Sequence, residues 1–203
     1  MSLAERRKAE LRREIIDAAF ACLAENGYHA TGIADIAARL GIGHGTFYRY
    51  FENKRDIVEH VMDDLVAKIL ATLAADNAPD AVSTLDAYRD QSQRIGQALG
   101  RILLEDPRIP RMILLEAPGI DTAMGQRVLD FYALAASLTA DYLKHGVDLR
   151  YLRSDLDVDG TAQAIVGMIL GSALAAVQNP DPADQARLSA ALRRVMYDGI
   201  AAR

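Results

Sequence analysis

Apolar residues recur every three or four positions along almost the whole chain, and no stretch alternates with a period of two. Leu11, Ile15, Ala18 and Cys22 show this spacing near the start, and it returns in segment after segment. This period predicts amphipathic helices. We therefore expect an all-α protein of about nine helices, at residues 4–25, 33–40, 44–51, 54–77, 80–104, 111–116, 121–145, 157–178 and 183–201.

Glycine, proline and short polar residues mark where these helices should begin and end. Gly27 should end the first helix, since glycine adopts the left-handed conformation without Cβ strain. Asn53 is expected to cap the helix that follows it, and Asp56 completes a start of the capping-box kind. Gly146 and the Asn-Pro-Asp-Pro segment at 179–182 should end the two long helices that precede them.

One long segment, residues 160–180, carries no charge. Its apolar part covers only residues 164–177, which is shorter than the ~20 residues that span a bilayer. We therefore expect that this segment does not contact a membrane. We expect it to form a helix that is buried inside the protein or in a subunit interface. The first residues lack the apolar segment of a secretory signal, and a single cysteine excludes a disulfide framework, so a cytoplasmic protein is expected.

Charge divides the chain unevenly. Residues 1–60 carry nine Lys or Arg and nine Asp or Glu, whereas residues 61–203 carry fourteen and nineteen and hold the whole net charge of −5. Within the neutral part, basic residues gather at the extreme N-terminus and again at residues 39–55. This pattern suits a small module with a basic surface on an acidic remainder, although solvated helix faces would produce it too.

The segment at residues 31–56 reads TGIADIAARLGIGHGTFYRYFENKRD. Two short predicted helices are joined there by a glycine-containing turn, which is the helix-turn-helix pattern. Gly41 should supply a positive φ, and Ile42 and Phe47 should fill the core beneath the turn. The second helix of such a unit enters the major groove of DNA, and its outward residues would be His44, Gly45, Thr46, Tyr48 and Arg49. An arginine at this place can bind guanine through two hydrogen bonds.

At these residues the sequence resembles the tetracycline-repressor-type (TetR) family of bacterial transcriptional regulators. The residues that carry the resemblance are Thr31, Ile33, Ile36-Ala37, Gly41-Ile42, Gly45-Thr46-Phe47-Tyr48, Tyr50-Phe51 and Asn53-Lys54. The resemblance implies a DNA-binding domain at residues 1–53, with its motif at about 32–51, and a helical effector-binding and dimerisation domain at residues 54–203.

The resemblance also implies a set of DNA contacts: Thr31, Gly32, His44, Gly45, Thr46, Tyr48, Arg49, Tyr50 and Lys54. Tyr50 and Lys54 resemble phosphate contacts, and His44 and Arg49 fall where the family varies its operator choice. Gly32 and Gly43 replace the hydroxyl residues usual at these two positions, both of which are expected N-caps. Glycine there costs only a few tenths of a kcal/mol, so the helices should form.

Two further sets follow from the resemblance. An effector pocket is expected among the helices after residue 54, and its candidates are the polar or adaptable residues Tyr88, Gln91, Gln97, Met112, Glu116, Met124, Phe131, Tyr132 and Gln163. Its apolar bias suggests a lipophilic or aromatic ligand. The last two helices should form a homodimer interface, with candidates Ala164, Gly167, Met168, Gly171, Ala175, Leu188, Leu192 and Val195.

The expected function is that of a non-enzymatic regulator, a repressor released by its effector from a palindromic double-stranded DNA operator. Two alternatives remain: an activator or effector-independent DNA-binding protein, and a helical small-molecule-binding protein without DNA function. No cofactor or metal is expected, because the glycines at 41, 43 and 45 follow no strand, and the aspartates at 155, 157 and 159 lack the final glutamate of a calcium loop. The pair His60 and Asp64 offers too few ligands for a metal.

Overall fold

The computed structural model describes residues 2–104, 108–179 and 181–198, and every regular element in these ranges is helical. This confirms the all-α prediction. The α-helices are α1 Leu3–Asn26, α2 Ile33–Leu40, α3 His44–Phe47, α4 Lys54–Thr72, α5 Leu85–Leu104, α6 Arg108–Arg111, α7 Thr122–Asp148, α8 Val158–Gln178 and α9 Pro182–Asp198. Shorter helical turns lie between them: η1 Ala75–Asn77, η2 Pro79–Ala81, η3 Met112–Glu116 and η4 Ala117–Gly119.

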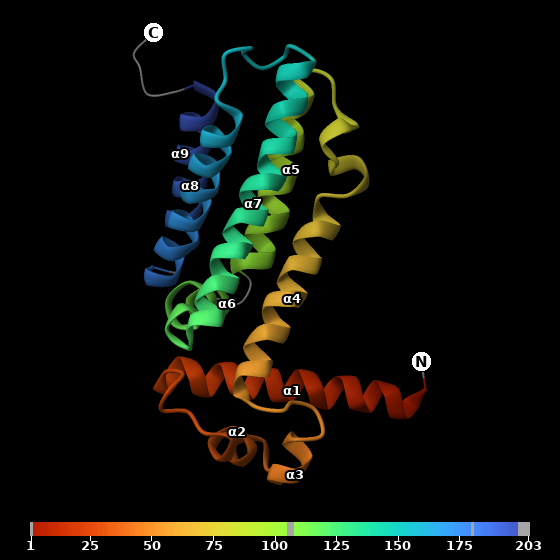
Figure 1. Cartoon of the computed structure of the whole chain (residues 1–203), viewed down its shortest axis with the longest axis vertical. Helices are drawn as coiled ribbons and strands as arrows, with labels where there is room; N and C mark the ends of the chain where they lie inside the picture. The colour runs from red at the N-terminus through yellow and green to blue at the C-terminus, as the bar shows by residue number, and fades with distance from the viewer. Residues whose placement is uncertain (1, 105–107, 180, 199–203) are drawn as a thin grey trace.

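The helices form two parts of different orientation. Helix α1 lies across one end of the molecule with α2 and α3 beneath it, and α4 rises from this end (Figure 1). Helices α5, α7, α8 and α9 run lengthwise beside α4 as a bundle, and α6 lies where the bundle meets α1. The helix-turn-helix segment is therefore held at one end of an elongated helical body.

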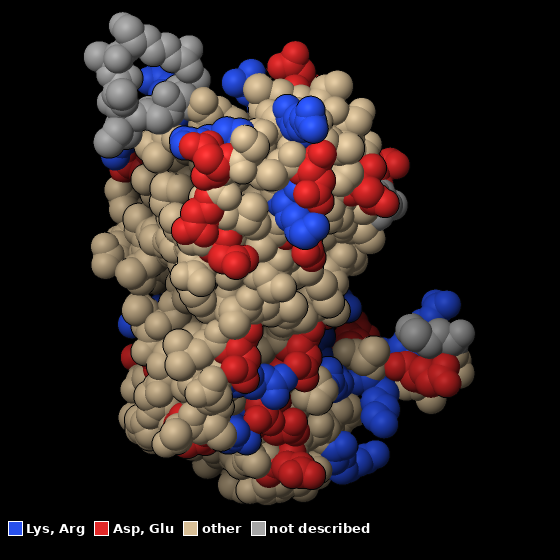
Figure 2. Space-filling model, turned by 45° about the horizontal axis from the view of Figure 1, so that its top comes forward, with Lys and Arg blue, Asp and Glu red and all other residues tan. Residues whose placement is uncertain are grey.

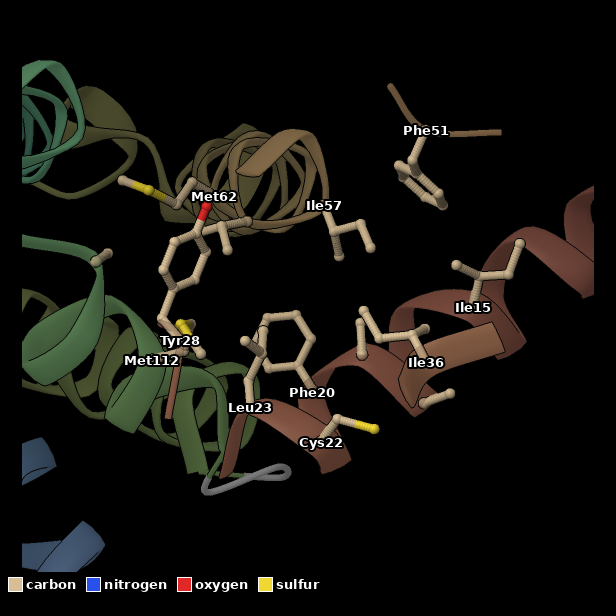
Figure 3. Close-up of a cluster of buried hydrophobic side chains, with 14 of the residues drawn as sticks. Ile15, Phe20, Cys22, Leu23, Tyr28, Ile36, Phe51, Ile57, Met62 and Met112 are labelled. Atoms are coloured by element: carbon tan, nitrogen blue, oxygen red, sulfur yellow. The ribbon is translucent and has the colours of Figure 1, made fainter. Parts of the chain in front are cut away.

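One hydrophobic core crosses the junction between the two parts. Figure 3 shows Ile15 of α1, Ile36 of α2, Ile57 and Met62 of α4, and Met112 of η3 within one cluster of buried side chains. Because the first turns of α4 are embedded in this cluster, a movement of α4 cannot leave α1–α3 undisturbed.

The bundle helices differ from the predicted bounds at several ends. Helix α4 ends at Thr72 rather than at 77, and α5 begins at Leu85 rather than at 80, with η1 and η2 between them. Asn77 turns the chain here, since its side-chain Nδ2 donates to the carbonyl of Thr72 at 3.0 Å. The helix predicted at 111–116 is instead α6 followed by the π-helical η3. Helix α9 is described to Asp198, and residues 199–201 of its predicted range lie outside the described residues.

Gly146 does not end α7 as predicted, because the helix continues to Asp148. A Cβ at Gly146 would lie 2.5 Å from the Cδ1 of Leu152 and 2.7 Å from the Cε2 of Tyr151. The glycine therefore lets the following segment pack closely against the helix. The reversal itself occurs at Arg150, which has a positive φ of 63°.

Helix α8 leaves an apolar side uncovered. By length and composition α8 is long and apolar enough to cross a membrane, but only 28% of its most apolar window is buried inside the protomer. Asp157 caps its start and accepts a hydrogen bond from the N–H of Gly160 at 3.0 Å. Burial on all sides within the described part of the chain is therefore excluded, and burial in a subunit interface stays a prediction.

Candidate nucleic-acid interface

The helix-turn-helix forms as the sequence predicts over its first helix and turn. Helix α2 spans Ile33–Leu40, and Gly41 follows it in the left-handed conformation with φ 66°. The Gly41 N–H donates to the carbonyl of Ala38 at 3.1 Å, and the N–H of Ile42 donates to the carbonyl of Ala37 at 3.0 Å. The predicted positive φ at Gly41 is thus confirmed, and a side chain at this position would strain the turn.

Helix α3 is shorter than predicted, ending at Phe47 rather than at 51. After α3 the chain continues in tight turns. The N–H of Arg49 donates to the carbonyl of Thr46 at 3.2 Å, and the N–H of Tyr50 donates to the carbonyl of Phe47 at 2.9 Å. Phe47 and Phe51 are both buried, and their ring centroids lie 6.1 Å apart. The turn after α3 allows both rings to enter the core.

The predicted DNA contacts of α3 and the turn after it reach the surface to different extents. The side chains of His44 and Arg49 are exposed, Gly45 is exposed, and Tyr48 is 55% exposed. Thr46 and Tyr50 are half-buried. Gly32 and Gly43 occupy the N-caps of α2 and α3, as predicted, and both positions are exposed.

Thr31 does not reach this surface. It is only 1% exposed, and its hydroxyl lies 2.9 Å from the carbonyl oxygen of Gly27 and 3.1 Å from that of Cys22. The prediction that Thr31 contacts DNA is therefore wrong for its side chain, which instead ties the start of α2 to the end of α1.

Lys54 has a structural role in addition to any contact with phosphate. Its Nζ donates to the carbonyls of Tyr28 and Thr31, the second at 2.7 Å, and lies 4.3 Å from the centre of the Tyr28 ring. Burial lowers the pKa of Lys54. Two of its three N–H groups are thereby used inside the protein, and one remains for a phosphate.

A basic hollow of about 740 Å³ opens between the start of α1 and the segment after α3. It is lined by Leu3, Ala4, Arg7, Lys8, Leu11, Arg49 and Tyr50. Arg7 and Lys8 come from the charged N-terminal run, which sequence reasoning noted without assigning it to the site. Helix α1 brings them beside Arg49, which lies far from them along the chain, and Figure 2 shows Lys and Arg side chains around the projecting start of α1.

The cations of this end of the molecule differ in whether they form ion pairs. Arg39 forms a two-point ion pair with Glu25 at 2.8 Å, and Arg55 pairs with Glu59 and Asp121. Within the described residues, by contrast, Arg7, Lys8 and Arg49 have no acidic partner. Unpaired cations at an exposed hollow are suited to a polyanion.

Polar contacts outside the shared core also hold the segment after α1 and the start of α4 against the rest of the body. The N–H of Tyr28 donates to Glu116 Oε2 at 2.9 Å, and His29 Nε2 lies 3.1 Å from the carbonyl oxygen of Gly119. Arg55 in the first turn of α4 donates to Asp121, the N-cap of α7, at 2.8 Å. The backbone hydrogen bond from Met124 and the Arg55 guanidinium hold the pKa of Asp121 below its usual value.

Replacing Glu116 by alanine should reduce the free energy of unfolding by about 1–3 kcal/mol, because the Tyr28 N–H then loses its partner. Operator binding should weaken as well, since the α1–α2 connection loses its tie to the body. Chemical denaturation and an operator titration measure the two effects. Asp90→Ala, at an exposed position of α5, is the control and should leave both unchanged. A Glu116→Ala protein as stable as the parent contradicts the assigned role.

The structure divides the predicted effector residues between different environments. Met112 and Met124 are buried in the core that crosses the junction, and Phe131 packs against that core. Tyr88 and Gln91 are buried together on α5, away from it. Gln97 and Gln163 are exposed in the single chain, and their place in an effector site stays a prediction.

Two further effector candidates serve inside the protomer. Glu116 accepts the hydrogen bond from the Tyr28 N–H, and the Tyr132 hydroxyl donates to the carbonyl of Gln163 at 3.1 Å.

The predicted interface residues lie mostly at the surface of the single chain. Ala164, Gly167, Gly171 and Ala175 are exposed along one side of α8, and Val195 of α9 is 43% exposed. Met168, Leu188 and Leu192 are half-buried.

Comparison with known proteins agrees with this geometry. A family model described as bacterial regulatory proteins, tetR family, matches residues 15–61, which include α2, the turn and α3. An HTH-type transcriptional repressor of Mycobacterium tuberculosis is 31% identical over 140 residues, covering 64% of this chain and 74% of its own. The chain belongs to the tetR family of bacterial regulatory proteins. It is therefore a DNA-binding transcriptional regulator, as the motif predicted.

Other members of the tetR family match over nearly the full length. The fatty acid metabolism regulator protein of Bacillus subtilis is 24% identical over 190 residues, covering 92% of this chain and 94% of its own. The crystal structure of FadR from that organism in complex with stearoyl-CoA has a TM-score of 0.75 and covers 93% of this chain and 99% of its own. A FadR structure from Bacillus halodurans has a TM-score of 0.78 at 21% identity, covering 95% and 97%. Most of the chain thus shares their fold.

Proposed function

We propose that this tetR-family regulator is a homodimeric repressor that binds a palindromic operator and releases it when a small lipophilic or aromatic effector binds. The observation that carries the proposal is the basic hollow, where the unpaired cations Arg7, Lys8 and Arg49 lie beside α3. A regulator with this surface acts where chromosomal DNA lies, so the proposed location is the cytoplasm.

The proposed DNA contacts fall into two groups. His44, Gly45 and Arg49 are exposed at α3 and would face base edges, where an arginine binds guanine through two hydrogen bonds. Thr46, Tyr48, Tyr50 and Lys54 remain as phosphate contacts, and Arg7 and Lys8 join them from the basic hollow. Gly32 lies at the same surface, but its N–H already donates to Asp35 Oδ2 at 2.7 Å. Contacts of the second group position the protein without reading sequence.

The proposed dimer uses the open side of α8. Small residues at 164, 167, 171 and 175 leave that side flat and apolar, so the α8 helix of a second copy can approach closely across a twofold axis. Two α3 helices related by this axis fit half-sites about 34 Å apart. We assign residues 1–53 to DNA binding and residues 54–203 to dimerisation and effector binding, although both parts share the core around Ile57 and Met62.

The proposed effector acts through α4. This helix begins in the core of α1–α3, and its far end lies beside α5 and η1. A ligand that binds one arrangement of α4 more tightly shifts the spacing of the two α3 helices and releases DNA. The stearoyl-CoA complex of the FadR relative and the repressor names of other relatives support a lipophilic effector and negative regulation.

The test begins with an operator selected from random duplex DNA and then measures salt dependence. Replacing Arg7 and Lys8 together by glutamine should weaken binding to all sequences alike and reduce the slope of log affinity against log salt by about 2, one for each phosphate that is no longer neutralised. Arg49→Ala should instead relax base preference at one position of each half-site.

The matched control replaces Lys68 and Lys144, two exposed lysines of the body, by glutamine. This double replacement changes the net charge by the same amount. It should leave the salt slope unchanged. If the variants at the basic hollow and in the body change the slope equally, the effect comes from net charge alone and the proposed interface is wrong.

A further inference from the structure

A chain of ion pairs joins α4 to the start of α7. Arg55 Nε donates to Asp121 at 2.8 Å, and another nitrogen of the same guanidinium lies 2.8 Å from Glu59 Oε1. Arg127 approaches that same Glu59 oxygen at 4.0 Å and donates to Asp63. We call these five residues the α4–α7 charge network. Acidic and basic residues alternate along it, so each arginine is bound to two carboxylates.

The network attaches α4 to α7 at two levels. Arg55, Glu59 and Asp63 follow one another at intervals of four, which places them on one face of α4. Helix α7 supplies Asp121, its N-cap, and Arg127. Both helices run away from the end that carries α1–α3 (Figure 1). The lower attachment at Arg55 and the upper one at Asp63 are therefore separated by about 12 Å along the axis of α4.

Two polar attachments at different levels control the angle of α4 more closely than apolar packing does. Ile57 and Leu65 of α4 are buried in the core that crosses the junction. Apolar attraction is non-directional, whereas a hydrogen-bonded ion pair requires a defined geometry. A single pair would leave α4 free to pivot about it, but a second pair further along the helix opposes the tilt.

The network is better suited to positioning α4 than to stabilising the fold. Its side chains are between 27% and 68% exposed, so each pair alone adds little to the free energy of unfolding. Two orientations of α4 that keep the same core differ little in free energy, and a small contribution is then enough to decide which one is populated. Removing one pair should leave the protein folded and change the orientation.

The DNA-binding part moves with α4 at this place. Arg55 lies in the first turn of α4, which is embedded in the core of α1–α3. His29 Nε2, in the connection between α1 and α2, lies 3.1 Å from the carbonyl oxygen of Gly119, two residues before Asp121. The direction in which α1–α3 extend from the body is thus set beside the network.

We propose that Arg55 and Arg127 are positioning residues that set, through the α4–α7 charge network, the half-site spacing which the regulator accepts. The network holds α1–α3 at one angle to the body, and in the dimer this angle fixes the separation of the two α3 helices. One base pair more or less moves a half-site by about 3.4 Å. The inference rests on the proposed function for the dimer and its operator, whereas the angle is a property of each chain.

The first measurement needs no DNA. Spin labels are attached at Ala38→Cys on α2 and Ser137→Cys on α7, two exposed positions, while Cys22 is buried and should not react. Pulsed electron spin resonance then gives the distance distribution between the labels of one chain, with labelled protein diluted in unlabelled protein. Arg55→Gln and Arg127→Gln should each broaden this distribution. A distribution that stays unchanged in both variants overturns the proposal.

A reversed ion pair tests the network rather than the single residue. Arg127→Asp should broaden the distribution, and adding Asp63→Arg should narrow it again, because the two partners have then exchanged places. Lys68→Gln is the matched control, since Lys68 pairs with Asp64 at 2.7 Å within α4, and it should change nothing. Equal broadening with and without Asp63→Arg contradicts the proposal.

The second measurement compares the selected operator with versions that have one base pair added or removed between the half-sites. The parent protein should bind the altered operators about tenfold more weakly, since the DNA must be deformed to fit. Arg55→Gln and Arg127→Gln should reduce this difference to about threefold or less, with an unchanged salt slope because neither arginine neutralises a phosphate. Equal weakening on all operators with a slope reduced by about 1 would instead identify a phosphate contact and refute the positioning role.

The two measurements separate this inference from the proposed function. If the parent protein binds no palindromic operator, the proposed function fails, and the label distances still decide whether the network holds the angle. If the operator is bound and the distances do not respond to the variants, the proposed function stands and the network is not what positions α4. Broader distances with an unchanged spacing preference show that the network does not set the spacing, and the proposal is wrong.

Discussion

Replacing Gly171 by arginine should leave the protomer folded and yet convert the regulator into a monomer that binds its operator about a hundredfold more weakly. A Cβ at Gly171 would meet no atom within 4 Å, so the protomer has space for the new side chain. In the proposed dimer the same side chain would place a desolvated charge against an apolar helix, which is strongly unfavourable. In a dimer, binding of one protomer to its half-site holds the second protomer near the other half-site at an effective concentration in the millimolar range. A monomer loses this gain in affinity.

Sedimentation velocity measures the oligomeric state, thermal unfolding measures the fold, and an operator titration measures binding. The matched control is Gly96→Arg on α5, another exposed glycine where a Cβ meets nothing within 4 Å. Gly96→Arg should remain a dimer with nearly unchanged operator affinity. A dimeric Gly171→Arg protein that binds DNA as well as the parent would show that α8 is not the interface.

Replacing Phe47 by alanine should reduce the free energy of unfolding by about 3–5 kcal/mol and abolish operator binding. Phe47 is fully buried and packs near Phe51, with Tyr48 at 5.7 Å in an edge-on arrangement. Helix α3 contains only four residues, too few to be stable alone, so its position depends on the burial of Phe47, its buried residue. Without Phe47, the exposed residues that face DNA lose their fixed orientation.

Denaturant unfolding measures the stability loss, and hydrogen exchange over residues 33–53 shows whether the helix-turn-helix has loosened. The control is Tyr48→Ala, one position away and 55% exposed, which should change stability by only about 0.5 kcal/mol while still weakening DNA binding. If Phe47→Ala binds the operator within a fewfold of the parent, α3 is not held by its core contact and this account of the interface is incorrect.

Much of the helix-turn-helix follows from local sequence. The bounds of α2, the left-handed Gly41, and the cap at Asn53 are all readable because each depends on neighbouring residues alone. The Asn53 side chain accepts the N–H of Asp56 at 3.0 Å, as predicted. The Asp56 carboxylate departs from the expected capping box, since it accepts the N–H of Glu52 rather than that of Asn53.

The individual roles in the candidate site were less predictable. Thr31 and Lys54 resemble DNA contacts by their place in the motif, but the carbonyls that they bind belong to the end of α1 and to the segment after it. Arg7 and Lys8 lie outside the motif and reach the site only because α1 passes beside Arg49. No local pattern indicates which distant backbone groups a side chain will meet.

The sequence by itself determined the helical class, the helix-turn-helix and its family, because periodicity, caps and a glycine turn act over a few residues. Only the tertiary structure decided that Gly146 serves close packing rather than a helix end, and that one side of α8 stays open. These features depend on burial and on contacts between residues far apart in the chain, which arise when the helices pack together.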